Sequence, residues 1–263
     1  MRTNHEIDYK IFGEEMQYVE IELDPQETAI AESGSFMMMD EGIQMATIFG
    51  DGAKPQQGFL GKLMSAGKRI LTGESLFMTT FTNTAQGKKR VSFASPYPGK
   101  IIPLDLMELG GKIVAQKDAF LCAAKGVSVG IEFQRRLGTG LFGGEGFIMQ
   151  KLEGDGMAFV HAGGHVFEKT LQPGELLKID TGCLVAYSQT IDYDIQFVGG
   201  IKNTIFGGEG LFFATLRGPG KVWIQTLPIS RLAGRILTYA TTTRKGEGSI
   251  LGGIGNVLDG DGW

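Results

Sequence analysis

The stretch LFGGEGFIMQKLEGDG at residues 141–156 returns as IFGGEGLFFATLRGPG at residues 205–220, and a shorter copy, LTGESLFMTTFTN, stands at residues 71–83. A segment that recurs at long and similar intervals indicates an internally repeated architecture. The intervals from Gly73 to Gly144 and from Gly144 to Gly208 are each long enough to hold a small sheet. The sequence therefore predicts three packed β modules in one chain.

Apolar and polar residues alternate just before the glycine motif in the last two copies. The alternating apolar residues are Val127, Val129, Ile131 and Phe133 in one copy, and Ile191, Tyr193, Ile195 and Phe197 in the other. Alternation with a period of two is typical of a strand with one buried face. The turns EGDG at 153–156 and RGPG at 217–220 are typical of hairpin connections. Each copy is therefore expected to be a set of strands.

Corners built around Pro separate the expected modules. The segment LQPGELLKID at 171–180 is echoed by YPGKIIPLD at 97–105 and by LDPQET at 23–28. Pro followed by Gly fits the two central positions of a type II turn. These corners place the modules at about residues 14–93, 94–162 and 163–227. We expect a single all-β domain over residues 1–227, with pseudo-threefold symmetry.

The pattern changes after Pro228. Four apolar residues recur at helical spacing, namely Ile229, Leu232, Ile236 and Tyr239. This spacing predicts a short C-terminal helix. The tail GEGSILGGIGNVLDGDGW at 246–263 holds too many glycines for a stable isolated helix, so we expect it to be either docked or disordered. Residues 228–263 are thus a helix and a Gly-rich tail that follow the β domain.

The composition favours self-association and a location in the cytoplasm. Hydrophobic residues make up 42% of the chain and charged residues only 21%, so we expect part of the surface to be buried in a homo-oligomer. The net charge of −4 gives no general attraction to nucleic acid. The N-terminus MRTNHEIDYK has no apolar signal region, and no apolar run is long enough to span a membrane. A membrane is therefore expected to be contacted only peripherally.

Three features carry a resemblance to a known family: the GGEG motif before a strand, the PGE corner followed by Leu184, Val185 and Ala186, and the stretch HAGGH at 161–165. Over residues 6–240 the chain resembles a family of uncharacterised bacterial and fungal proteins whose fungal member is named for altered inheritance of mitochondria. The resemblance implies three short double-stranded β-helix modules, each similar to the subunit of the ring-forming tryptophan RNA-binding attenuation protein. It implies no reaction, and the fungal member looks like an inner-membrane factor that supports cristae.

The glycine motif admits two interpretations. In the structural one, its glycines supply positive φ or a bulge where the chain enters a strand. The motif residues are Gly73 and Glu74, then Gly143, Gly144 and Glu145, and finally Gly207, Gly208 and Glu209. In the other interpretation, a threefold axis brings the three Glu side chains together around a cation or a basic ligand. Three close carboxylates repel one another, so such a site requires a positive partner.

Basic residues lie a few positions before the same motifs. They are Lys68, Arg69, Arg135, Arg136 and Lys202, and Lys62 joins them from the segment 59–71 as a possible anion or membrane contact. These side chains could neutralise the motif carboxylates, form a solvated face, or bind phosphate groups and lipid headgroups. The segment FLGKLMSAGKRIL at 59–71 puts its apolar residues close to one helical face, which favours a membrane contact there.

His161 and His165 flank a predicted turn, and with Glu168 they form the alternative metal set in this sequence. The HxH pattern of the cupins is absent, and the remaining histidine, His5, is distant in the sequence. No nucleophile signature such as GxSxG is present either. We therefore expect no metal, no cofactor and no catalytic residue.

The compact basic run Lys88, Lys89 and Arg90 invites an RNA-binding interpretation. Aromatic residues for base stacking do not surround it, so nucleic acid is not favoured. The sequence instead predicts a non-enzymatic scaffold or interaction protein, peripheral to the cytoplasmic membrane through residues 59–71 or the C-terminal tail. RNA or small-ligand binding is the first alternative, and a metal-dependent β-helix enzyme is the second.

Overall fold

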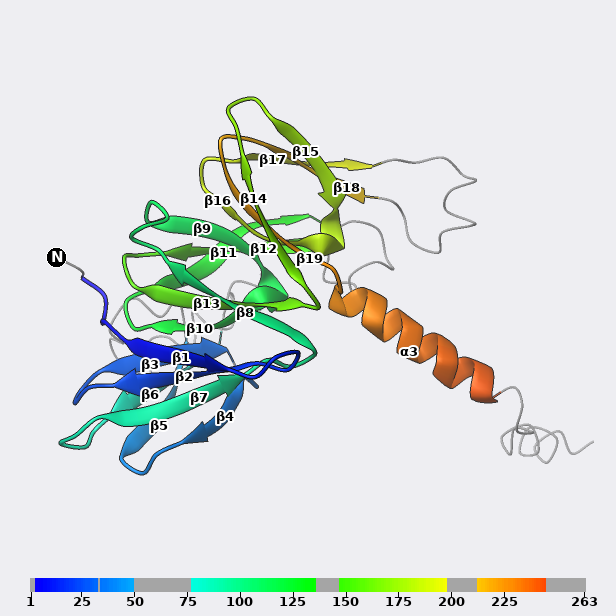
Figure 1. Ribbon diagram of the computed structural model, residues 1–263. Helices are drawn as coiled ribbons and strands as arrows, with labels where there is room; N and C mark the ends of the chain where they lie inside the picture. The colour runs from blue at the N-terminus through cyan, green and yellow to red at the C-terminus, as the bar shows by residue number, and fades with distance from the viewer. Residues whose placement is uncertain (1–2, 33, 50–76, 136–146, 198–211, 245–263) are drawn as a thin grey trace, which may run out of the picture.

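The computed structural model describes residues 3–32, 34–49, 77–135, 147–197 and 212–244. Strands dominate these residues, and helix α3 (Ile229–Arg244) follows the last strand (Figure 1). The predicted all-β class and the predicted short C-terminal helix are both confirmed. Within the described ranges, no helix is long and apolar enough to cross a membrane.

The described strands fall into three consecutive groups of six. The first group, preceded by β1 (Asp8–Phe12), is β2 (Tyr18–Leu23), β3 (Thr28–Glu32), β4 (Phe36–Met39), β5 (Ile43–Phe49), β6 (Phe77–Asn83) and β7 (Lys89–Ala94). The second is β8 (Gly99–Asp105), β9 (Lys112–Gln116), β10 (Phe120–Ala124), β11 (Ser128–Arg135), β12 (Phe147–Glu153) and β13 (Met157–Gly163). The third is β14 (Val166–Leu171), β15 (Leu176–Asp180), β16 (Leu184–Ser188), β17 (Asp192–Phe197), β18 (Phe212–Arg217) and β19 (Gly220–Gln225).

The same antiparallel pairing recurs in each group. The sixth strand lies between the first and the third, as β7 lies between β2 and β4, β13 between β8 and β10, and β19 between β14 and β16. The fifth strand lies between the second and the fourth, as β6, β12 and β18 show. A β-bulge recurs on the third strand, between Phe36 and Met38, Phe120 and Cys122, and Leu184 and Ala186. Each group is thus two half-sheets of three strands.

Neighbouring groups join where the second strand of one group pairs with the third strand of the next, as β3 does with β10 and β9 with β16. Each junction fuses two half-sheets into one six-stranded sheet, β5-β6-β3-β10-β13-β8 and β11-β12-β9-β16-β19-β14. The remaining half-sheets form the separate sheets β1-β2-β7-β4 and β15-β18-β17 at opposite ends of the molecule (Figure 1). Closure about a threefold axis is not seen among the described strands and stays a prediction.

Small and apolar residues at these junctions let the groups share one core. Ala31 lies opposite Cys122 and Ala115 lies opposite Ala186, and all four side chains are buried. One buried cluster contains residues of all three groups, from Ile30 to Trp223. Because burying apolar surface is the main favourable contribution to folding, this shared cluster ties the groups together.

Helix α3 begins directly after Pro228, whose carbonyl accepts the backbone N–H of Arg231 at 3.0 Å and of Leu232 at 3.2 Å. The Arg231 guanidinium also donates to Asp180 Oδ2 at 3.0 Å, which ties the first turn to the end of β15. Beyond that turn the helix projects away from the sheets (Figure 1).

Candidate functional site

Most residues singled out from the sequence lie outside the described part of the chain. These are Gly73, Glu74, Gly143, Gly144, Glu145, Gly207, Gly208 and Glu209 of the glycine motif, and the basic residues Lys62, Lys68, Arg69, Arg136 and Lys202. Arg135 ends β11, but its side chain is also outside the description. The segments 59–71 and 246–263 fall there as well. Their structural and ligand-binding interpretations therefore stay predictions.

His161 lies on β13 and is buried, with 2% of its surface exposed. Its ring packs edge-on against Tyr97, with the ring centroids 4.3 Å apart. Neither ring nitrogen makes a hydrogen bond within the described residues, although the main chain of Tyr97 is close enough to favour the charged ring slightly. Burial prevails and lowers the pKa of His161 to about 4, so the ring is neutral at neutral pH.

His165 and Glu168 have other neighbours. The backbone N–H of His165 donates to Thr226 Oγ1 at 2.9 Å. The Glu168 carboxylate accepts hydrogen bonds from Lys221 Nζ at 2.7 Å and from Trp223 Nε1 at 2.9 Å. Across the residues that the structure describes, no three His, Cys, Asp or Glu side chains gather into a group that could hold a metal ion. The alternative metal set of His161, His165 and Glu168 therefore does not form.

The basic run in the first hairpin is neutralised by its own sheet. Lys88 Nζ lies 2.9 Å from Glu22 Oε1 and 3.2 Å from Asp8 Oδ2. The Nε and Nη2 atoms of Arg90 both donate to Glu22 Oε2, at 3.0 and 2.9 Å. Hydrogen bonds from Lys88 and Arg90 lower the pKa of the Glu22 carboxyl. Two of the three cations are thus already paired with carboxylates, which weakens the RNA-binding interpretation.

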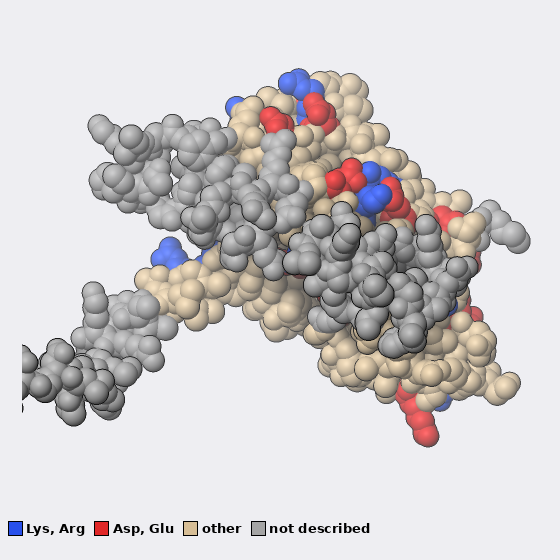
Figure 2. All heavy atoms as spheres, turned by 180° about the vertical axis from the view of Figure 1, so that it is seen from behind, with Lys and Arg blue, Asp and Glu red and all other residues tan. Residues whose placement is uncertain are grey.

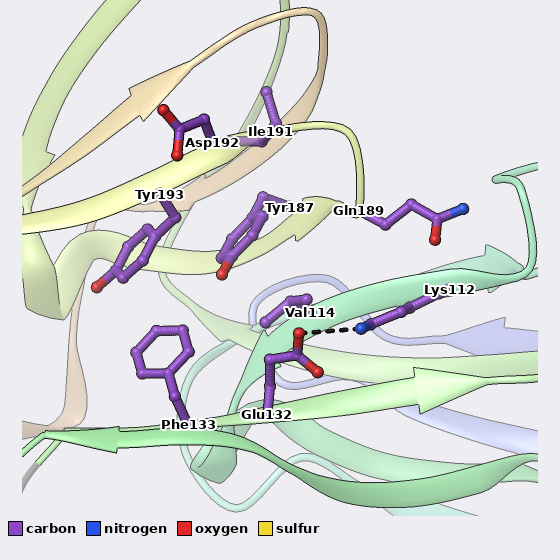
Figure 3. Close-up of a pocket in the computed structure, with 9 residues that line it drawn as sticks. All are labelled: Lys112, Val114, Glu132, Phe133, Tyr187, Gln189, Ile191, Asp192 and Tyr193. Atoms are coloured by element: carbon purple, nitrogen blue, oxygen red, sulfur yellow. Dashed lines mark hydrogen bonds and ion pairs between the residues drawn. The ribbon is translucent and has the colours of Figure 1, made fainter.

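A pocket opens at the junction of the second and third groups. Its lining residues come from β9, β11, β16 and β17 and the turn before β17: Lys112, Val114, Glu132, Phe133, Tyr187, Gln189, Ile191, Asp192 and Tyr193. Figure 3 shows the rings of Phe133, Tyr187 and Tyr193 on one side and the Lys112–Glu132 ion pair on the other. The Lys112 Nζ to Glu132 Oε1 distance is 2.9 Å.

The aromatic rings of this pocket stack on one another. The ring centroids of Tyr187 and Tyr193 are 5.3 Å apart and the rings are nearly parallel, while Phe133 lies 5.1 Å from Tyr193. Burial, helped by the charge of Glu132, raises the pKa of Tyr187, so its phenol stays neutral. The cavity measures about 240 Å³, which is below the roughly 300–1,000 Å³ of most small-molecule sites. We interpret it as a packing gap at the β9–β16 junction.

A larger cavity of about 570 Å³ lies between β8, β13, β14 and β19. Two of its carboxylates, Glu168 and Asp105, are engaged with protein donors. Glu168 accepts from Lys221 and Trp223, as described above, and Asp105 Oδ1 accepts the backbone N–H of Met107 at 3.1 Å. A ligand site of this size usually offers a few polar groups directed at the ligand. Here these two carboxylates face protein partners instead.

The exposed apolar surface of α3 is the feature that the sequence analysis did not single out. Ile236, Leu237 and Tyr239 are 60%, 64% and 77% exposed. The residues of the helix include three arginines, Arg231, Arg235 and Arg244, and no acidic residue. Figure 2 shows acidic and basic side chains interspersed over the described surface of the sheets, whereas the projecting helix carries only basic ones. The spacing of its apolar residues was visible in the sequence, but its exposure was not.

Comparison with known proteins gives three similarities. The chain matches the family model described as mitochondrial biogenesis AIM24 over residues 9–227. It is similar to an uncharacterised protein of Streptococcus pyogenes serotype M6, with 33% identity over 229 residues that cover 86% of this chain and 87% of the relative. The fold is similar to an X-ray crystal structure of a Streptococcus pyogenes protein, with a TM-score of 0.69 and 26% identity over 89% of this chain and 99% of the other.

Proposed function

The chain belongs to the mitochondrial biogenesis AIM24 family, and on this premise we propose that it is a non-enzymatic scaffold protein that binds anionic membrane surfaces through α3. The description of the family names a cellular process and no reaction. The observation that carries the proposal is the exposed apolar face of a helix that holds only basic charges. The proposal includes a cytoplasmic location, which is supported by the thiols of Cys122 and Cys183, both free in the described structure.

The residues of α3 divide into two faces. At 100° per residue, one face carries Ile229, Leu232, Ala233, Ile236, Leu237, Tyr239 and Ala240. The opposite face carries Ser230, Arg231, Gly234, Arg235, Thr238, Thr241 and Thr242, and the last two residues, Thr243 and Arg244, fall on the apolar side by the same count. A helix with this division normally lays its apolar face on a core, but the middle of this face is exposed in the described structure. An interfacial membrane helix has the same division of faces.

The charge of α3 favours a membrane with anionic headgroups. Arg231 is held by Asp180, which leaves Arg235 as the cation that this ion pair does not engage among the described side chains of the helix. A basic residue near an anionic surface contributes about 1 kcal/mol. This corresponds to a roughly five-fold preference for anionic over neutral vesicles. Insertion of Ile236 and Leu237 between the headgroups adds an apolar contribution that salt does not screen.

Vesicle flotation tests the proposal, with vesicles of phosphatidylcholine alone and of phosphatidylcholine mixed with phosphatidylglycerol. The test variant is Ile236→Asp with Leu237→Asp on the apolar face. The matched control is Thr238→Asp with Thr242→Asp, which adds the same charge to the polar face. We expect the wild-type chain to float with the anionic vesicles and the test variant to stay at the bottom. The control should float less than wild type at low salt and approach wild type at high salt, where its added charges are screened.

Two results would contradict the membrane proposal. One is a wild-type chain that stays at the bottom with anionic vesicles at low salt. The other is equal flotation of the test and control variants, since an attraction that ignores the apolar face is only electrostatic. Because α3 lies outside the core, we expect each variant to keep a folded β domain. Circular dichroism of each variant checks this.

A further inference from the structure

Together, the two end sheets contain the same kinds of strands as one complete six-stranded sheet. In both complete sheets, the fourth, fifth and second strands of one group meet the third, sixth and first strands of the next. The end sheet β15-β18-β17 is a half of the first kind, and β1-β2-β7-β4 is a half of the second kind with β1 added. Among the described strands, β15 and β4 each have a hydrogen-bonded neighbour on one side only. We infer that copies of this chain assemble head to tail, with β15 of one copy pairing with β4 of the next.

Burial at equivalent positions supports this pairing. The shared bulge makes Phe36–Met39 equivalent to residues 120–123 on β10 and 184–187 on β16. Every residue of β10 and β16 is buried, whereas every residue of β4 is exposed. The exposed fractions from Phe36 to Met39 lie between 41% and 47%. An apolar edge strand without a charge or a proline is what soluble proteins avoid unless another strand covers it.

The other edge shows the same contrast. The pairing of each second strand with its fifth makes Ile30, Val114 and Lys178 equivalent. Ile30 and Val114 are buried at the two internal junctions, whereas Lys178 on β15 is exposed. Leu176, at the start of β15, is also exposed, at 45%. A charged side chain such as Lys178 is exposed on free edge strands as well, so the supporting observation on β15 is the exposed apolar side chain of Leu176.

The internal junctions fix the register of the third. Cys122 lies opposite Ala31 at one junction, and Ala186 lies opposite Ala115 at the other. The equivalent residues at the ends are Met38 on β4 and Ile179 on β15. An assembled pair therefore places Met38 opposite Ile179 and Met39 opposite Lys178, in antiparallel strands. Because side chains alternate between faces, a shift of one residue would put each of them on the wrong face.

The partner is a second copy because, among the described strands, β15 with its half-sheet is the one that supplies what β4 lacks. The two strands lie at opposite ends of the molecule, so one chain does not bring its own pair together (Figure 1). The contact joins unlike surfaces, and repetition of such a contact closes a ring or extends a filament. This inference stands on strand pairing and does not depend on the proposed membrane contact.

Two single substitutions test the head-to-tail contact. Met38→Lys places a charge on β4 and leaves β15 intact, whereas Ile179→Lys does the reverse. Met107→Lys is the matched control, because Met107 is 53% exposed in the turn between β8 and β9, away from both edges. Sedimentation velocity at micromolar concentration measures the mass of each protein alone and in mixtures.

We expect the wild-type chain and the control to form species larger than the 28.4 kDa chain. Each edge variant alone is expected to be a monomer. A mixture of the two is expected to give a heterodimer and nothing larger, since one intact β4 meets one intact β15. Formation of that heterodimer also shows that both variants are folded.

A wild-type chain that stays monomeric overturns the inference. Dimers of Ile179→Lys alone also overturn it, because they would show that β4 pairs with β4. If Ile179→Lys fails to fold by circular dichroism, Leu176→Lys replaces it, since Leu176 is already exposed on the same strand. Absence of a heterodimer between folded edge variants contradicts the inference as well.

Discussion

Replacing His161 with Asn should change how the stability of the protein depends on pH. His161 is buried against Tyr97, and its pKa is lowered to about 4 from an ordinary value of 6.5. Between these two values the unfolded chain binds a proton that the folded chain does not bind. The neutral His161 therefore makes its full contribution to the free energy of unfolding above pH 6.5. This contribution is lost as the pH falls toward 4.

The size of this effect follows from the shift. Each pKa unit corresponds to about 1.4 kcal/mol, so the full effect is about 3 kcal/mol, of which about 2.5 kcal/mol is already lost at pH 4.5. Glu32 acts in the opposite direction, because burial, assisted by Asp118, raises its pKa to about 7. Its contribution to stability is complete below pH 4.5 and is lost as the pH rises through 7. For the wild-type protein, the two contributions nearly cancel between pH 4.5 and pH 7. A plot of its unfolding free energy against pH should therefore look nearly flat and hide both effects.

The assay is urea unfolding, followed by tryptophan fluorescence, at several pH values between 4.5 and 7.5. The quantity to compare is the difference in unfolding free energy between wild type and His161→Asn, because Glu32 and the surface groups cancel in this difference. Relative to wild type, the variant should gain about 2.5 kcal/mol from pH 7 to pH 4.5. His161→Leu serves as a second variant with a larger apolar side chain. If the unfolding free energies of wild type and both variants change with pH in parallel, the buried neutral histidine is refuted.

Three further predictions concern single side chains. Glu32→Gln should remove the opposite pH dependence and stabilise the protein by about 2–3 kcal/mol at pH 7.5, with no gain at pH 4.5; an equal gain at both pH values would contradict the buried carboxyl. Phe159→Ala should cost about 3–5 kcal/mol because Phe159 is fully buried, whereas exposed Phe167→Ala should cost less than about 0.5 kcal/mol; similar melting temperatures for both would refute the assigned core. Gly99→Ala should destabilise by about 1–3 kcal/mol because a Cβ there would collide with the carbonyl of Ala162, whereas Gly87→Ala, in open space, should be close to neutral in the same urea titration.

Strands with one buried face, such as β2 and β11, could be predicted from their local pattern. The alternation of Val127, Val129 and Ile131 marks β11 and the residue just before it, and the turn EGDG falls between β12 and β13. The helical spacing after Pro228 marks α3 in the same way. These signals depend on neighbours in the sequence, so one chain without relatives is enough to read them.

The junctions could not be predicted, because they join residues that are far apart in the sequence. Ala31 and Cys122 are small residues in apolar runs, and nothing local says that they lie opposite each other. The run from Phe36 to Met39 reads as core by composition, yet it is an exposed edge because its counterpart strand lies at the other end of the molecule. The same limit applies to His161, whose sequence neighbours suggested a turn with two histidines but whose ring is buried against Tyr97.

Disulfide trapping across the proposed junction tests the central claim, that each repeat pairs its second strand with the third strand of the next repeat within and between copies. Chains with Met38→Cys are mixed with chains with Ile179→Cys, both in a Cys183→Ser background, and are oxidised mildly. The account predicts a covalent dimer, and much slower cross-linking when Met39→Cys replaces Met38→Cys, because its side chain points to the other face. Equal cross-linking by Met38→Cys and Met39→Cys, or none by either, would contradict the account.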